Sequence, residues 1–319
     1  MAGSSSPSTA PPGALIWLAP GLMVISGLSN YAGAALAVGL FEQFPPWLAA
    51  WLRMGSAGLI LTVVLRPALR DFWGRAGALA AVYGAVTLAM NTAFYEAIAR
   101  LPMGTVVAIE FTGPIVVAAV GSRTLRDWVA VVCAAGGVVA LSGAQWSASA
   151  SGVILALLAA TMWGTYIVVG ARISGDAATS TTSMAVGFTW AGIATLPLAI
   201  AGWPGQHPGD LDGMRILGVA LGLGVLSAVI PYGLDQVILR MAGPAHFAVL
   251  LALLPLTAAV LGAVVLHQGL SAAEIGGIAA VVAAVVVRAG TRGQATVRRS
   301  APPTAFDEVV GDADTPIQP

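Results

Sequence analysis

Long apolar runs follow one another along almost the whole chain, separated by short polar connections. A transmembrane helix needs about 20 mostly apolar residues. Ten runs come close to that length, at approximately residues 14–38, 46–65, 77–98, 103–121, 127–144, 151–171, 182–202, 216–236, 246–266 and 273–289. Only 9% of the 319 residues are charged, whereas soluble domains carry roughly 25%. The sequence therefore predicts an all-α integral membrane protein with ten transmembrane helices.

The arginines predict the orientation of these helices. All 14 basic residues are arginine. With a cytoplasmic N-terminus, the connections on the inner side carry Arg66, Arg70, Arg75, Arg123, Arg126, Arg172, Arg240, Arg288, Arg292, Arg298 and Arg299. Only Arg100 and Arg215 then lie at the outer ends of helices. Because basic residues are enriched in cytoplasmic loops, both termini are expected in the cytoplasm.

Both ends of the chain are polar and low in complexity. Residues 1–13, "MAGSSSPSTAPPG", lack the basic segment that opens a secretory signal. We expect residues 1–13 to be a disordered lead and residues 290–319 to be a disordered cytoplasmic tail.

Several function classes are disfavoured by missing features. The single cysteine, Cys133, cannot build a disulfide framework or a cysteine metal cluster within one chain. Neither a Walker loop nor the Gly-x-Ser-x-Gly and His-Glu-x-x-His motifs occur. No large basic face for nucleic acid is present. We therefore expect neither a cofactor nor a metal and no enzymatic activity, and the sequence specifies no oligomeric state.

The chain contains an internal repeat. The stretch from Arg100, "RLPMGTVVAIEFTGPIVVAAVG", can be aligned with the stretch from Arg240, "RMAGPAHFAVLLALLPLTAAVLG". In this alignment Pro114 corresponds to Pro255. Each half, residues 14–144 and 150–289, then holds five helices. Because five is odd, the two repeats must cross the membrane in opposite senses. Inverted repeats with helices interrupted by proline are typical of secondary transporters, so Pro114, Pro231 and Pro255 are candidate helix-break or gating residues.

Four stretches carry a family resemblance: "MNTAFYEAIARLPMGTVVAIEFTGPIVVA" from Met90, "MWGTYIVVGARI" from Met162, "LSAVIPYGLDQVILRM" from Leu226 and "LLALLPLTAAVLGAVVLHQGLS" from Leu250. Between about residues 14 and 289 the chain resembles the EamA-type drug/metabolite transporter superfamily, and within it the threonine and homoserine exporters. The resemblance implies export of small amino acids across a bacterial-type inner membrane. The chain differs from the family at His267 and Gln268, where Leu-Gly-Glu commonly ends the ninth helix, and at Glu96, usually an uncharged position.

Glu110 and Arg53 are ionisable residues within apolar runs. Each lies six or seven residues from the expected outer end of its helix, or roughly 10 Å deep at about 1.5 Å per residue. Intramembrane charges are expensive and commonly functional. One interpretation is that Glu110 binds a substrate amino group or the coupling proton while Arg53 binds a substrate carboxylate. The other is a structural Arg53–Glu110 ion pair that never touches substrate.

Further polar and aromatic residues are candidates for the same site. Asn91 and Tyr95 share a helix face, as do Trp163 and Tyr166. Asp235 belongs either to a cytoplasmic gate or to the headgroup layer. The candidate substrate-binding set is Glu110, Arg53, Asn91, Tyr95, Thr112, Trp163, Tyr166 and Asp235.

Two features have structural explanations. Glu96 has an i,i+4 partner in Arg100, which explains it as an ion pair. Gly218 and Gly222 form a small-xxx-small pattern that lets helices approach closely.

Together these features predict a secondary transporter that works by alternating access, and the resemblance implies that it exports threonine, homoserine or similar amino acids. Protons are the expected coupling ion, and the lipid bilayer is the surrounding solvent. Efflux of another small metabolite, such as a purine, a sugar derivative or a drug, is the alternative within transport. An integral membrane enzyme is the alternative from another class.

Overall fold

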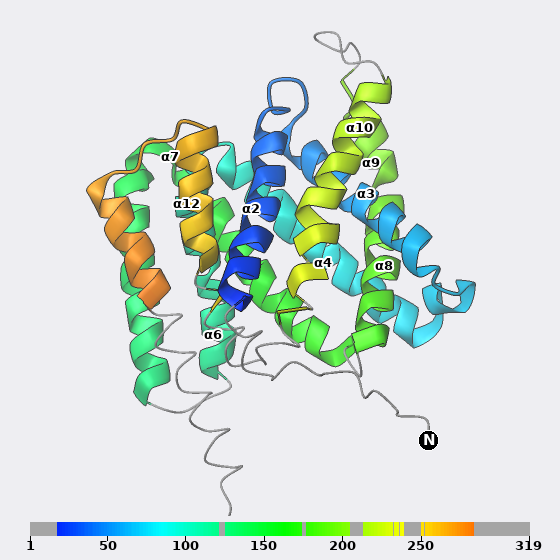
Figure 1. The fold of residues 1–319 in the computed structure, drawn as a ribbon, viewed down its shortest axis with the longest axis horizontal. Coiled ribbons are helices and arrows are strands. Elements are labelled where there is room, and N and C mark those ends of the chain that lie inside the picture. The colour runs from blue at the N-terminus through cyan, green and yellow to red at the C-terminus, as the bar shows by residue number, and fades with distance from the viewer. Residues whose placement is uncertain are drawn as a thin grey trace, which may run out of the picture.

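The computed structural model describes residues 18–120, 125–173, 177–204, 213–231, 233–235, 237–238, 250–251 and 253–283. These residues form helices joined by turns and short loops, and no strand occurs among them (Figure 1). The two segments predicted to be disordered, residues 1–13 and 290–319, lie outside the described residues.

The helices of the first half are α2 (Ala19–Val38), α3 (Pro46–Leu65), the 3-10 turn η1 (Leu69–Phe72), α4 (Gly74–Ile98), α5 (Met103–Glu110) and α6 (Thr112–Val120). Those that follow are α7 (Leu125–Ile173), α8 (Ala177–Ala194), α9 (Leu196–Ala201), α10 (Gly213–Gly224), the π-helical turn η2 (Val225–Val229) and α12 (Leu253–Val265). A further apolar helix covers Ala272–Ala283.

Many of these helices have the length and composition of membrane spans. Five are long and apolar enough to cross a bilayer, at Ala19–Val38, Pro46–Leu65, Gly74–Ile98, Ser149–Gly170 and Gly213–Asp235. Shorter apolar helices cover Met103–Val117, Leu253–Val265 and Ala272–Ala283. The predicted all-α membrane fold is confirmed, while the count of ten spans and the inverted arrangement of the two halves stay predictions.

Proline and glycine set several helix boundaries. Pro46 opens α3, where the missing N–H of proline costs nothing because the first helical N–H groups have no partner. α3 ends at Leu65; Arg66 follows with a left-handed φ of 49°, and Pro67 comes next. α4 begins at Gly74, whose φ of 69° favours glycine.

Three expected spans have internal irregularities. α7 joins the spans expected at 127–144 and 151–171, but Ser149 breaks it with non-helical dihedral angles, φ −159° and ψ 84°. The span expected at 103–121 divides into α5 and α6. The span expected at 182–202 divides into α8 and α9 just before Pro197, which cannot supply the N–H that the Ile193 carbonyl would bind.

The core is centred on α5. All eight of its residues are buried, and it packs against α4, α7 and α12. The outer surface is apolar, as expected where lipid replaces water. Its exposed side chains include Val63, Val64, Leu198, Ile200 and Val264.

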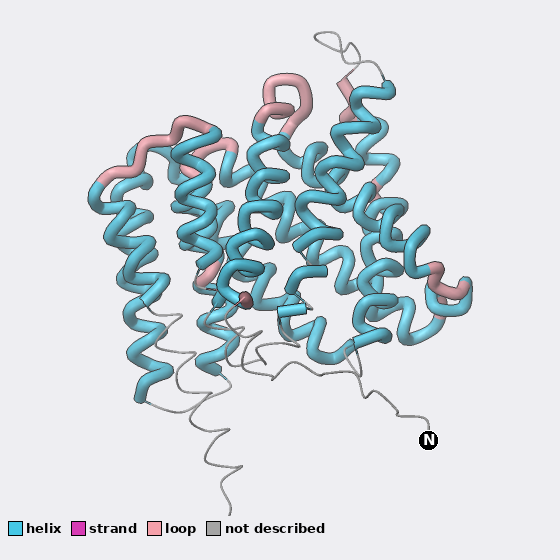
Figure 2. The backbone as a smooth tube through the Cα atoms, viewed as in Figure 1, coloured by secondary structure: helices cyan, strands magenta, loops and turns pink. Residues whose placement is uncertain are grey.

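The connections before α3 and after α12 lie at one end of the bundle. Figure 2 shows the loops at residues 39–45 and 266–271 at the upper end of the view. The arginine distribution predicts that both loops face outward.

Within the described part of the chain, close helix contact does not occur at the predicted glycine pair. A Cβ added at Gly218 would have nothing within 4 Å, and one at Gly222 would first meet Leu36 at 3.9 Å. The expectation for this pair was wrong, because the exposed side of α10 carries Gly218. Among the described residues, much closer contacts occur at Gly84 and Gly113, where a Cβ would lie 1.9 Å from a backbone oxygen of another helix.

Candidate functional site

Arg53 lies where four helical elements meet. It extends from α3, is only 9% exposed, and donates from Nη2 to Asn30 Oδ1 at 2.9 Å and to the Ser227 carbonyl oxygen at 3.0 Å. Its Cζ lies 5.7 Å from the ring centroid of Tyr95, which is within cation–π range. Arg53 therefore connects α3 with α2, α4 and η2.

Pro231 leaves the Ser227 carbonyl without an α-helical donor, and this oxygen accepts from Arg53 instead. In an α-helix this oxygen would accept from the N–H four residues later, and proline has no N–H. The chain forms the π-helical turn η2 at Val225–Val229, and such turns are frequent at functional sites. The structure thus places the predicted helix break at Pro231 next to Arg53.

Glu110 lies at a second helix break. It is the last residue of α5, and a turn at Phe111 separates it from α6. Pro114 explains the break, because its missing N–H leaves the Glu110 carbonyl without its helical donor. Thr112 directs its hydroxyl back to the Ile109 carbonyl at 2.7 Å, so its side chain stabilises the end of α5.

Glu110 is a buried residue whose carboxyl group has no polar partner among the described residues. The residue is 8% exposed, and no hydrogen bond or ion pair joins it to the described part of the chain. Arg53 is near enough to act on it electrostatically, but no nitrogen of Arg53 lies within 4.0 Å of its oxygens. The structural ion pair considered from the sequence is therefore not formed.

Two buried tyrosines lie near Arg53, and one of them also lies near Glu110. Tyr31 of α2 is 4% exposed and lies within electrostatic range of Arg53, Glu110 and Asp235. Tyr95 of α4 is fully buried, and its hydroxyl lies close to Arg53 and Ser227 without completing a hydrogen bond to any described residue. An unpartnered buried hydroxyl is costly, so its presence beside Arg53 indicates a ligand site.

Asn91 lies on the same buried face of α4 as Tyr95. It is 4% exposed, and its Nδ2 donates to the Thr87 carbonyl at 2.8 Å. One amide hydrogen of Asn91 is thus used within α4.

Asp235 is linked to α2. Ser26 Oγ donates to Asp235 Oδ1 at 2.8 Å, and it also reaches the Pro231 carbonyl at 3.5 Å. Asp235 therefore contacts α2, the same helix that contacts Arg53 through Asn30.

A polar face of α2 was missed by the sequence analysis. Ser26, Ser29, Asn30 and Gly33 follow the i, i+3, i+4, i+7 spacing of one helix face. Ser29 Oγ donates to the Leu226 carbonyl at 2.7 Å. A Cβ at Gly33 would lie 1.9 Å from Ser227 Oγ. Three polar residues at helical spacing in an apolar run were the available signal.

The predicted aromatic pair on α7 divides between two environments. Trp163 packs edge-to-face on Phe111, with ring centroids 4.8 Å apart, and so lies beside the break at Glu110. Tyr166 packs on Tyr83, also at 4.8 Å, in a separate cluster with residues of α8. The structure brings Trp163 to the Glu110 break but not Tyr166.

The aligned prolines occupy matching positions. Pro114 is the third residue of α6 and Pro255 is the third residue of α12. Pro255 is buried where α12 packs against α2. Each proline therefore lies in the first turn of its helix rather than in a helix interior.

Glu96 has the structural role that its spacing predicted. It forms an ion pair with Arg100 at 2.6 Å, and the Arg100 side chain also donates to the Glu96 carbonyl. Its Oε1 in addition accepts the backbone N–H of Trp47 at 3.1 Å, in the first turn of α3. The ion pair is confirmed.

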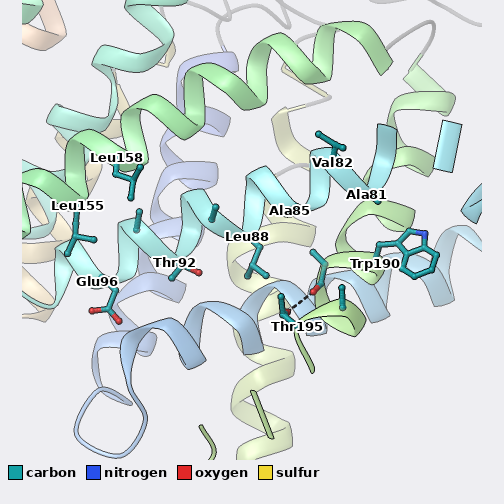
Figure 3. A pocket seen from close by; sticks show the side chains of 14 residues that line it. Ala81, Val82, Ala85, Leu88, Thr92, Glu96, Leu155, Leu158, Trp190 and Thr195 are labelled. Carbon is teal, nitrogen blue, oxygen red and sulfur yellow. Dashed lines mark hydrogen bonds between the residues drawn. The ribbon is translucent and has the colours of Figure 1, made fainter. Parts of the chain in front are cut away.

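Glu96 also closes one end of a lateral groove of about 750 Å³ between α4, α7 and the α8–α9 region. Figure 3 shows apolar side chains such as Leu88, Leu155 and Leu158 along the groove, with Trp190 at the far end. The groove follows a different face of α4 from Asn91 and Tyr95, so it is separate from the Arg53 and Glu110 site.

Polar side chains from the last part of the chain bind the start of α5. Gln268 Oε1 accepts the Met103 N–H at 2.9 Å. Glu274 accepts from the Thr105 hydroxyl at 2.9 Å and from the Ser271 N–H at 2.8 Å. Ser271 and Glu274 together form the capping box of the helix Ala272–Ala283. The uncommon Gln268 therefore anchors α5 to the opposite half.

The apolar helices, with a buried charged site between them, define an integral membrane protein. The model of the EamA-like transporter family matches residues 150–289. The threonine/homoserine exporter RhtA of Salmonella typhimurium LT2 is 32% identical over 272 residues, which are 84% of this chain and 90% of the exporter. RhtA of Escherichia coli K12 is 30% identical with the same coverage. The chain belongs to the EamA-like transporter family, and it is an export transporter.

A solved crystal structure supports the fold alone. It is 17% identical, covers 84% of this chain and 96% of its own, and superposes with a TM-score of 0.54.

Proposed function

We propose that this transporter exports small amino acids of the threonine and homoserine type from the cytoplasm, by alternating access coupled to protons. Its place is the inner membrane, with both termini cytoplasmic. The observation that carries the proposal is the relation of Arg53 to Glu110. Both are buried and within electrostatic range, yet they form no ion pair.

A zwitterionic amino acid matches this arrangement chemically. Its carboxylate pairs with the guanidinium of Arg53, and its ammonium pairs with the carboxylate of Glu110. The unpartnered hydroxyl of Tyr95 adds a donor beside Arg53. Unpaired charges within a membrane are expensive, so a ligand that pairs with both stabilises the occupied site.

Proton coupling is supported by the single carboxyl group of Glu110, which serves two cations in turn, the substrate ammonium and a proton. When it holds the substrate ammonium it is ionised, and after substrate release it takes a proton from the outer side. A membrane carboxyl group that alternates between two cations acts as a proton relay. The helix breaks at Pro114 and Pro231 supply the interrupted helices that alternating access uses in inverted-repeat transporters.

The test is counterflow into proteoliposomes. Vesicles loaded with unlabelled threonine are diluted into labelled threonine, and transient accumulation is measured for the wild type, Glu110→Gln and empty vesicles. Accumulation by the wild type and its loss in Glu110→Gln is the expected result. Counterflow needs no coupling ion, so the proton is tested separately by acidification inside vesicles during downhill threonine efflux.

Glu96→Gln is the matched control, because it makes the same chemical change at an ion pair away from the site. It is expected to retain counterflow. A folded, inserted wild-type protein that accumulates no threonine or homoserine above empty vesicles would refute the substrate assignment.

A further inference from the structure

We infer that Pro231 and Asn30 are positioning residues, which hold one nitrogen of Arg53 and leave its other N–H groups to recognise a carboxylate. The inference rests on the proposed function and adds what makes the site select a carboxylate. Neither residue needs to touch the substrate.

Pro231 provides the first anchor. Because it lacks an N–H, it gives no donor to the Leu226 carbonyl in the five-residue ladder of η2 or to the Ser227 carbonyl in an α-helical ladder, and within a membrane the Ser227 carbonyl needs a donor from a neighbouring helix. Arg53 Nη2 supplies it at 3.0 Å. Removing the proline would return an N–H four residues after Ser227, and the helix would compete with Arg53 for this oxygen.

Asn30 provides the second anchor. Its Oδ1 accepts from the same Nη2 at 2.9 Å. α2 can approach this closely because Gly33 has no side chain, since a Cβ there would meet Ser227 Oγ at 1.9 Å. Ser29 reinforces the contact through its bond to the Leu226 carbonyl at 2.7 Å. α2 and η2 therefore form one unit that accepts from Arg53.

The two anchors use a defined part of the guanidinium. A guanidinium has five N–H donors, and both bonds come from Nη2. Nη1 and Nε make no hydrogen bond within the described residues. Neither of these two nitrogens is fully buried. The Tyr95 ring lies on one side of the group, with its centroid 5.7 Å from Cζ. A fixed guanidinium with unused donors loses little rotational freedom when it binds a carboxylate.

This arrangement predicts selectivity for a carboxylate over an alcohol at the same position. In Pro231→Ala and in Asn30→Ala, Arg53 loses an anchor and its donors are no longer held in place. The KM for threonine should rise about tenfold, the effect of weakening a hydrogen bond to a charged group, with a smaller change in kcat. Inhibition by threoninol, which has a hydroxymethyl group in place of the carboxylate, should stay within twofold of wild type.

The experiment measures threonine counterflow and its inhibition by threoninol in proteoliposomes of the full chain. Pro197→Ala is the matched control, because Pro197 lies in the first turn of α9, which supplies neither of the hydrogen bonds to Arg53, and it should keep the wild-type KM. Two results would overturn the inference alone. Either both variants keep the wild-type KM for threonine, or their affinities for threonine and for threoninol fall by the same factor. A wild type with no threonine counterflow would overturn the proposed function instead, and the inference with it.

Discussion

Gly84 of α4 and Gly187 of α8 cross in direct backbone contact. A Cβ added at Gly84 would lie 1.9 Å from the Gly187 carbonyl oxygen, and one at Gly187 would lie 2.3 Å from the carbonyl oxygen of Ala80. In a membrane, helices associate largely through van der Waals packing, which small residues at the interface permit. This crossing joins the helix that carries Asn91 and Tyr95 to α8.

Gly84→Ala should therefore destabilise the protein, because both backbones must move apart. Overpacking of this kind costs about 1–3 kcal/mol, and the midpoint of thermal unfolding in detergent measures it. Gly218→Ala is the control, since nothing lies within 4 Å of its Cβ position. Alanine is the better helix former by about 1 kcal/mol, so this variant should be neutral or more stable. Equal losses in both would contradict the crossing.

Trp163 and Tyr166 should have separable effects. Trp163 contacts Phe111 at the break next to Glu110, whereas Tyr166 contacts Tyr83 in another cluster. Trp163→Leu is expected to raise the KM for threonine, because the break loses its aromatic support. Tyr166→Leu is expected to lower the unfolding midpoint, through loss of about 0.5–1.5 kcal/mol of aromatic pairing, with KM unchanged. The reverse pattern would indicate that the substrate site lies near Tyr166 and α8 instead.

Glu274 should matter more for stability than its partner in the capping box. Glu274→Ala removes the cap and leaves the buried Thr105 hydroxyl without its acceptor, which adds about 1–3 kcal/mol to the cap loss. Ser271→Ala removes only the cap, at about 1 kcal/mol. Thermal unfolding midpoints of both variants, and of Glu274→Ala combined with Thr105→Val, measure the difference. The double variant should recover part of the loss, and no recovery would argue against the Thr105 contact.

The orientation can be tested through the single cysteine. In a Cys133→Ala background, Glu42→Cys and Ala68→Cys place one thiol in each of two exposed connections, before and after α3. A membrane-impermeant maleimide should label residue 42 in intact cells and residue 68 only after permeabilisation, because the arginines after α3 are expected inside. Labelling with the opposite pattern would reverse the predicted topology.

The sequence by itself predicted the class of this protein and its main ionisable residues. The length of its apolar runs and its scarcity of charge indicate that lipid surrounds the chain. This can be inferred from composition without knowing how the helices pack. A carboxylate in an apolar run, such as Glu110, stands out for the same reason. Pro114 predicted a helix break from its missing N–H alone.

Only the tertiary structure decided what these residues contact. Arg53 binds Asn30, 23 residues away, and the carbonyl of Ser227, 174 residues away, instead of pairing with Glu110. The sequence also grouped Tyr166 with Trp163, although the rotation of α7 directs them to different neighbours. Such contacts depend on how each helix turns about its axis and how closely glycines let it approach. The rotation and approach of each helix are determined by packing between segments distant in the chain, so a local sequence pattern does not predict them.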